Sequence, residues 1–436
     1  MGKRSIVVSL AAAAAAAAVC IALALPPGGE RDWAGDGAPP EPVKLVFMTW
    51  GNPSHLDMYE RLLDRFAELR PDIAIELESV PYPEYQQKLS VLAAGRELPD
   101  IAWAADRMIP QFRANHILAD VSETARDAGF DPGDFIPSTL DMFRGEDGML
   151  YGLPFSTPPS VMFYNADLFE RAGLTPPDTL HAQGRWTWER FRESARAIAA
   201  LSSGGERVYG ANFFRDWKTW IQLGSYAWSH GSGPFNARMT AFAWDDDAGV
   251  ATMRMLEEMM FDERSHPKVG EQAGFEGGGV GMFFDVYSYV SVARTIRDFR
   301  WNIAPLPSGP KGAVPMLGQA GYVVFEGSKH PEEAKALLRF LASREGIEAT
   351  SVYFVPPRAS VLNADAFLRQ PGAPANVKQA VIDQMASARF QPGHVNWQAI
   401  DTAVMSGLDR LWARELTPEQ TVRWVREQIE PLLREP

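Results

Sequence analysis

The stretch PDIAWAADR, residues 99–107, has the composition of a buried β-strand that ends on two charged residues. The run IAWA is apolar and short enough for a strand, and Asp106 and Arg107 follow it almost directly. Trp103 precedes the acid by three positions. A strand with this ending can carry an aromatic face, a carboxylate and a guanidinium towards one place, provided that it ends in a turn before Asp106.

Strands and helices alternate along the sequence that precedes this stretch. Strand-like and helical patterns occur in turn at residues 43–50, 58–71, 73–80 and 85–95. Such alternation predicts an α/β fold with parallel strands, in which ligands bind beyond the carboxyl ends of the strands. Asn52 and Asp106 both follow strands at such ends, so we expect both to face one cleft.

Three later segments join extended apolar runs through proline and glycine, at residues 150–165, 301–325 and 352–362. Proline fixes φ and lacks the N–H that a strand centre needs, so these segments suit passages between two bodies better than the middle of a sheet. The sequence therefore predicts two lobes and three crossings between them. The tail, residues 375–433, has a helical pattern.

Composition and charge exclude some partners. The chain has 436 residues, a net charge of −13 and no visible basic cluster, which argues against nucleic acid. No G-x-S-x-G, H-E-x-x-H or Walker motif occurs, and the seven histidines are scattered, so neither a cofactor nor a metal site is expected. Carboxylates are plentiful, which leaves a glycosidase pair open although no two acids stand out.

The N-terminus has the pattern of an export signal. Lys3 and Arg4 precede an apolar run, and residues 22–24 read ALA, which predicts cleavage after Ala24 and a periplasmic or extracellular protein. An uncleaved membrane anchor is the alternative, because the run is about as long as a bilayer-spanning helix. Cys20, the sole cysteine, is poorly placed for lipidation. Residues 25–42 are expected to form a flexible linker.

Tryptophan is abundant, with 13 residues, and several lie beside polar side chains. Trp103 precedes Asp106, Trp217 lies between an aspartate and a lysine, and Trp397 lies between an asparagine and a glutamine. An aromatic ring can stack on the C–H face of a sugar while neighbouring charged groups bind its hydroxyls. Core packing explains a single such tryptophan better, but three of them favour a carbohydrate site.

Together, these segments resemble the family of extracellular solute-binding proteins of sugar ABC transporters, in particular its maltodextrin-binding type, from about residue 43 to 433. The segments LPDIAWAADR (98–107), LYGLPFSTPPSVMFYN (150–165), DWKTW (216–220) and WQAIDTA (397–403) carry the likeness. The resemblance implies ligand-binding roles for Trp103, Asp106, Arg107, Trp217 and Trp397, and a structural role for Trp220.

The chain departs from the family pattern at three places, which puts maltodextrin itself in doubt. Asn52 and Pro53 replace an acid and a lysine, and Pro158 replaces a sugar-binding glutamate. In GMFFDVYSYV (281–290), Ser288 replaces a stacking tryptophan. Further ligand-binding candidates are Asp285, Tyr287, Gln319 and Arg358.

The resemblance implies a two-lobed type II periplasmic-binding-protein fold with three interlobe crossings. One lobe would hold residues 43–155 and 313–359, and the other 160–308 and 362–436. The expected function is to capture a sugar or oligosaccharide between the lobes and deliver it, as a monomer and without chemistry, to ABC permease subunits. The alternatives are a secreted glycoside hydrolase, a cell-wall carbohydrate-binding module, and a glycerol phosphate ester as the ligand.

Overall fold

The computed structural model describes residues 41–127, 129–214, 220–236, 238–271, 273–390 and 393–434. The predicted export signal, Cys20 and Trp217 lie outside these residues. In the described residues, none of the helices is both long enough and apolar enough to span a bilayer.

The first sheet has the strand order β2-β1-β3-β10-β4. Its strands are β1 (Val43–Thr49), β2 (Ile73–Ser79), β3 (Ile101–Ala105), β4 (Leu153–Ser156) and β10 (Ala320–Val324). The helices α1 (Pro53–Leu69) and α2 (Tyr82–Gly95) connect the first three strands, and β1 pairs in parallel with both β2 and β3. The alternation predicted from the sequence is therefore confirmed. Strand β10, which comes much later in the chain, joins this sheet antiparallel to β3.

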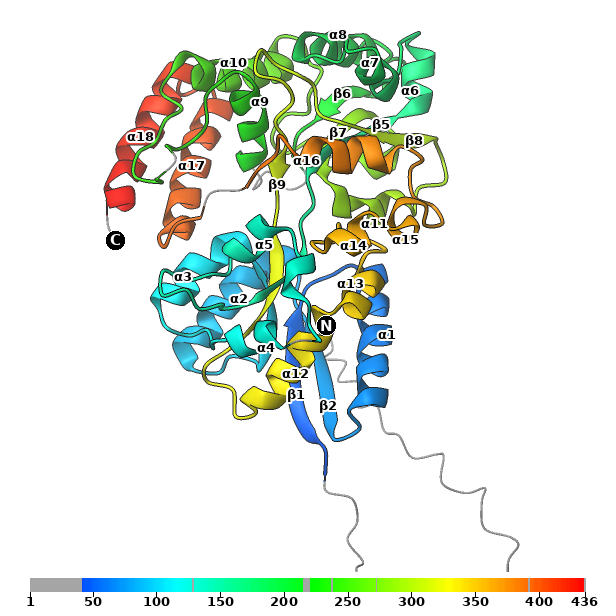
Figure 1. Ribbon diagram of the computed structural model, residues 1–436. Coiled ribbons are helices and arrows are strands. Elements are labelled where there is room, and N and C mark those ends of the chain that lie inside the picture. Colours follow the sequence, from blue (N-terminus) through cyan, green and yellow to red (C-terminus); the bar gives the residue numbers. More distant parts are fainter. Residues whose placement is uncertain are drawn as a thin grey trace, which may run out of the picture.

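The second sheet has the order β6-β7-β5-β8. Its strands are β5 (Ser160–Asn165), β6 (Tyr209–Asn212), β7 (Val280–Val286) and β8 (Trp301–Ala304). Figure 1 shows the two sheets in separate bodies, one above the other. Each body has its own apolar core, because the buried side chains near the first sheet form one cluster and those near the second form two others.

Four further helices adjoin a strand end, a crossing or an edge of the two bodies. Helix α3 (Ile109–Ala114) follows β3 in the first body, and α13 (Arg344–Thr350) precedes the last crossing. Helices α17 (Trp397–Trp412) and α18 (Pro418–Arg434) pack as an antiparallel pair at the edge of the second body. The expected helical tail is interrupted by β11 (Arg389–Phe390), which pairs with β9 (Met316–Leu317) between the two bodies.

The three predicted crossings lie side by side. Thr157 N donates to the carbonyl of Val355 at 2.9 Å, and Gly318 N donates to the carbonyl of Pro158 at 3.0 Å. Backbone hydrogen bonds thus join the first crossing to the second and to the third. Val314 and Met316, from the second crossing, pack in a core cluster of the second body. The connection between the bodies is therefore a narrow bundle of three strand-like segments.

Candidate functional site

A cavity of about 630 Å³ lies between the two bodies. The first body contributes side chains at the carboxyl ends of its strands and at the start of α2, and the second contributes the start of α17 and the end of β7. Of the ten candidate ligand-binding residues, six line this cavity: Trp103, Asp106, Arg107, Asp285, Gln319 and Trp397. Pro158 and Ser288, at positions where the sequence departs from the family pattern, line it too.

Asp106 lies at the tip of β3. The strand ends at Ala105 and a 3₁₀ turn begins at Asp106, so Asp106 and Arg107 can both reach the cavity. The side chain of Asp106 is almost fully buried, with 2% exposed. Its Oδ1 accepts from Arg107 N at 2.7 Å and its Oδ2 accepts from Gln319 N at 3.2 Å. Each carboxylate oxygen has two lone pairs, so each can accept one further hydrogen bond.

Burial controls the charge of this carboxyl group. Removal from water raises the pKa of Asp106 to about 6, while the charge of Arg107 and the two backbone N–H donors oppose the rise. The group is therefore ionised at neutral pH but becomes protonated in mild acid.

Arg107 is held by the first body and faces the second. Its Nε donates to Gln86 Oε1 at 3.1 Å, and its guanidinium donates to Tyr82 Oη at 3.2 Å. Burial disfavours the charged guanidinium, but Tyr82, Asp106 and Asp401 outweigh this effect, so the pKa of Arg107 is raised. Asp401 belongs to α17 of the second body, so the electrostatic interaction between Arg107 and Asp401 crosses the cavity.

Three aromatic rings form a cluster on the side of the first body. The ring centroids of Trp50 and Tyr82 are 4.7 Å apart, and those of Trp50 and Trp103 are 5.6 Å apart with the rings nearly perpendicular. All three residues line the cavity. Because each ring packs against a neighbour at a steep angle, the cluster holds its orientation without a ligand.

Trp397 provides an aromatic ring from the second body. It begins α17, is 3% exposed, and stacks on Trp220 at 6.0 Å with an interplanar angle of 16°. Trp220 Nε1 in turn donates to Asp401 Oδ1 at 2.6 Å. The structure therefore gives Trp220 the structural position that the resemblance implied, behind Trp397 and away from the cavity lining.

Arg358 was predicted to bind the ligand, but the structure places it outside the site. It does not line the cavity and is 1% exposed, within the first body. Its guanidinium donates to the carbonyls of Phe130, Asp131 and Ala342 at 2.8–3.0 Å and pairs with Asp134 at 3.3 Å. These acceptors occupy all three guanidinium nitrogens, so Arg358 holds loops together.

Asn52 and Tyr287 also lie outside the cavity lining. Asn52 caps α1 by accepting from His55 N at 3.0 Å, and its Nδ2 donates to Ser291 Oγ of the second body at 3.0 Å. Tyr287 is buried in a core cluster of the second body, where it packs on Phe367. The tip of β1 does face the cleft as expected, but Trp50 rather than Asn52 occupies the lining.

Sequence reasoning missed several lining residues: Trp50, Tyr82, Gln86, Gln222, Asp401 and Asp409. Two features of the sequence could have identified Trp50 and Asp401 as lining residues. Trp50 directly follows β1, by the strand-end rule that identified Asp106, and Asp401 lies one helical turn after Trp397.

Several buried polar atoms of the lining residues have no hydrogen-bond partner among the described residues: Trp50 Nε1, Ser156 Oγ, Gln222 Oε1 and Gln319 Oε1. An unpaired buried polar group is costly, and a polar ligand can remove that cost. The charged lining residues that the structure describes are four aspartates and one arginine, so the cavity is acidic.

Comparison with known proteins agrees with this architecture. The chain is 27% identical to the arabinooligosaccharide-binding protein of Bacillus subtilis, over 70% of each chain. It is 25% identical to the sn-glycerol-3-phosphate-binding periplasmic protein UgpB of Salmonella paratyphi A, over 86% of this chain and 89% of that protein.

Among solved structures, the ABC substrate-binding protein Lmo0181 of Listeria monocytogenes, in complex with cycloalternan, superposes with a TM-score of 0.80 at 19% identity. The match covers 90% of this chain and 99% of that protein. This likeness shows the two-lobed periplasmic-binding fold, as predicted. A sequence model of bacterial extracellular solute-binding proteins matches residues 52–348. Since this match spans more than half of the chain, the protein belongs to the bacterial extracellular solute-binding protein family.

Proposed function

We propose that this solute-binding protein captures a neutral carbohydrate, either a sugar or an oligosaccharide, in the cavity between its lobes. The observation that carries the proposal is the combination of Trp50, Tyr82, Trp103 and Trp397 with four aspartates in one cavity. Aromatic rings stack on the C–H faces of a sugar ring, and carboxylates accept its hydroxyl hydrogens. The family consists of binding proteins, so the role is capture and not catalysis.

The charge of the cavity favours a neutral sugar over a phosphate ester. A phosphate monoester is anionic and needs Arg, Lys or a helix N-terminus to bind it. Arg107 is the one basic residue among the described lining residues, and the starts of α2 and α17 also reach the cavity, but four aspartates surround the same space and repel an anion. The similarity to a glycerol-3-phosphate-binding protein makes that ester the rival ligand, and the acidic lining argues against it.

The proposal includes delivery. A monomer with residues 43–155 and 313–359 in one lobe and 160–308 and 362–436 in the other, except that Val314 and Met316 pack with the second lobe, would close about its three crossings and present the ligand to an ABC permease. The adjacent, hydrogen-bonded crossings support closure, since few backbone angles must change. The family is extracellular, which supports export to the periplasm or cell surface through residues 1–24.

A thermal-shift screen tests the ligand class. Monosaccharides, disaccharides, malto- and arabino-oligosaccharides and sn-glycerol 3-phosphate would each be added to the purified protein. We expect at least one carbohydrate to stabilise the fold, by about 2.7 kcal/mol at a hundred times its Kd. Stabilisation by sn-glycerol 3-phosphate and by none of the sugars would reject the proposal.

The pKa of Asp106 predicts how sugar binding depends on pH. Hydroxyl donors favour the ionised carboxylate, so binding shifts the pKa of Asp106 down from about 6. Affinity should therefore rise about tenfold between pH 5 and pH 7 and level off above pH 7. Titration calorimetry at several pH values measures this slope.

Two variants show whether Asp106 causes the slope. Asp106→Asn should bind more weakly at pH 7 and show no tenfold change, whereas Asp57→Asn, at an exposed position on α1, should behave like the wild type. A slope that persists in Asp106→Asn would assign the titration to another group.

A further inference from the structure

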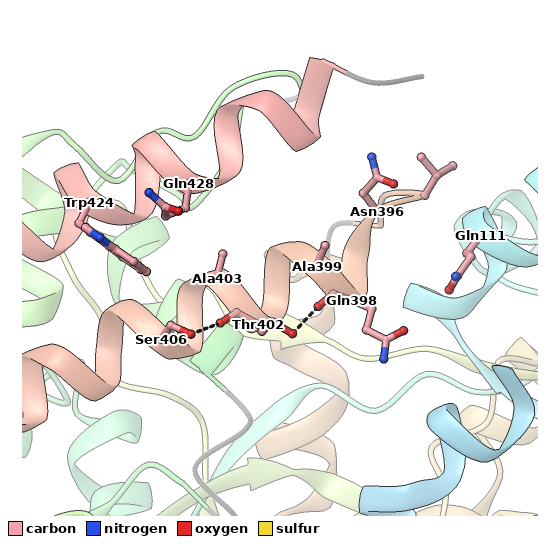
Figure 2. A pocket seen from close by; sticks show the side chains of 10 residues that line it. Gln111, Asn396, Gln398, Ala399, Thr402, Ala403, Ser406, Trp424 and Gln428 are labelled. Atoms are coloured by element: carbon pink, nitrogen blue, oxygen red, sulfur yellow. Dashed lines mark hydrogen bonds between the residues drawn. The ribbon is translucent and has the colours of Figure 1, made fainter. Parts of the chain in front are cut away.

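A second cavity, of about 570 Å³, lies outside the cleft against α17 and α18. Figure 2 shows its residues, with Trp424 and Gln428 on α18 opposite Ala399 and Ala403 on α17. We call it the α17–α18 groove. Three of its lining residues, Gln398, Thr402 and Ser406, also line the cleft. They are spaced by four positions, so they form one row along α17 that the two cavities share.

The chemistry of the groove differs from that of the cleft. None of its ten lining residues carries a charge, and most of the polar ones are amides: Gln111, Asn396, Gln398 and Gln428. The side-chain amides of Gln111, Gln398 and Gln428 make no hydrogen bond to any other residue that the structure describes. A surface of uncharged donors and acceptors matches the hydroxyls of a sugar and offers nothing specific to an anion.

The hydroxyls along the row are oriented for accepting. Thr402 Oγ1 donates to the carbonyl of Gln398 at 2.8 Å, and Ser406 Oγ donates to the carbonyl of Thr402 at 2.9 Å. Their hydrogens are engaged with the backbone, so their oxygen lone pairs remain to accept from a ligand.

Trp424 gives the groove a firm aromatic wall. Gly407 permits a close contact between α17 and α18, since a Cβ at this position would lie 2.3 Å from Val425 Cγ2 and 3.1 Å from Trp424 Cε3. The guanidinium of Arg410 lies 5.3 Å from the centroid of the Trp424 ring. Held by both helices, the half-buried ring can stack on a sugar with little loss of side-chain entropy.

The groove also reaches the first lobe. Gln111, on α3, faces it from the opposite side. The segment before α17 approaches α3, because a Cβ at Gly393 would lie 3.1 Å from Pro110 Cγ. A ligand that crosses the shared row from the cleft into the groove would therefore remain between the two lobes.

We propose that the α17–α18 groove is an outer subsite for the distal units of an oligosaccharide whose first units occupy the cleft. The inference rests on the proposed function and narrows the ligand to a carbohydrate longer than the cleft alone accommodates. The shared row formed by Gln398, Thr402 and Ser406 gives the path, and Trp424 with the amides of Gln111 and Gln428 gives the distal contacts.

Affinity as a function of ligand length tests this proposal. The probes are malto- and arabino-oligosaccharides of two to six units, titrated by calorimetry against the full chain. In the wild type, Kd should fall as units are added beyond those that the cleft holds. Trp424→Ala should weaken binding of the longest probe about three- to tenfold and leave the shortest unchanged.

Two further variants keep the test decisive if Trp424→Ala folds poorly. Ala399 is exposed and lines the groove but not the cleft, so Ala399→Arg blocks the groove without disturbing a core. It should remove the gain in affinity with length. Gln428→Ala should reduce that gain, whereas Glu427→Ala, exposed on the same helix and in neither cavity, should not.

The outcomes separate the two proposals. The outer subsite is overturned if affinity still increases with ligand length in Ala399→Arg, or if it does not increase with length in the wild type. Either result leaves sugar capture in the cleft intact. A wild type that binds no probe of either series overturns the outer subsite, whereas sugar capture itself is decided by the thermal-shift screen, which also includes monosaccharides. The subsite is supported if the increase in affinity with ligand length is lost in Ala399→Arg and kept in Glu427→Ala.

Discussion

Trp397→Ala should lower the free energy of unfolding by about 3–5 kcal/mol, the range for truncating a buried aromatic side chain. In the sequence, the polar residues on either side of Trp397 favoured a place in a carbohydrate site over a place in a core. The structure instead places it at 3% exposure, stacked on Trp220 and close to Phe235. Truncation would remove the ring that stacks on Trp220 and open a void at the start of α17.

The same variant should weaken sugar binding about three- to tenfold, through the loss of one aromatic wall of the cleft. Chemical denaturation without ligand measures the loss of stability, and calorimetry well below the melting temperature measures the loss of affinity for sugar. Trp397→Phe retains a ring and should recover part of both losses. A stable Trp397→Ala variant with unchanged affinity would remove this residue from both the core and the site.

Arg358→Ala should be equally destabilising, by about 3–5 kcal/mol, but should leave the affinity for sugar unchanged. Removal of the guanidinium takes its hydrogen bonds away from the carbonyls of Phe130, Asp131 and Ala342, and leaves Asp134 without its cation. The rings of Phe130 and Phe135, which lie 4.8 and 4.0 Å from the guanidinium, would lose their contact as well.

Urea denaturation measures the stability of Arg358→Ala, and calorimetry of the folded fraction measures its affinity. As a control, Arg369→Ala removes an exposed arginine that pairs with Asp365 on the surface, and should change stability by less than about 1 kcal/mol. A stable Arg358→Ala variant that no longer binds sugar would restore Arg358 to the ligand site.

The early part of the fold could be predicted because its signals are local. Apolar runs, helical periodicity and turn residues lie within a few positions of one another in β1, α1, β2, α2 and β3. The return of residues 313–359 to the first lobe was predicted, but the pairing of β10 with β3 was not, since it joins residues more than two hundred positions apart. Strand β11 is two residues long and has no periodicity to detect.

A site residue could be predicted from the sequence where its place at the end of a strand or helix determines that its side chain faces the cleft. Asp106 and Arg107 directly follow a strand, so both have a definite place relative to the cleft. Trp397 was identified instead from its polar neighbours and the family resemblance, and the structure places it at the start of α17. Arg358 illustrates the limit of such reasoning. An arginine after two prolines suits an exposed loop equally well, and its burial depends on carbonyls more than two hundred residues away.

In the proposed function, the cavity between the lobes holds a neutral carbohydrate. A crystal structure of the protein with the carbohydrate that stabilises it most tests this claim directly. We expect density for sugar rings in the cavity against Trp103 and Trp397, with hydroxyl groups within hydrogen-bond distance of Asp106 and Arg107. A carbohydrate bound only outside this cavity, or a phosphate ester bound within it in preference to any sugar, would contradict the account.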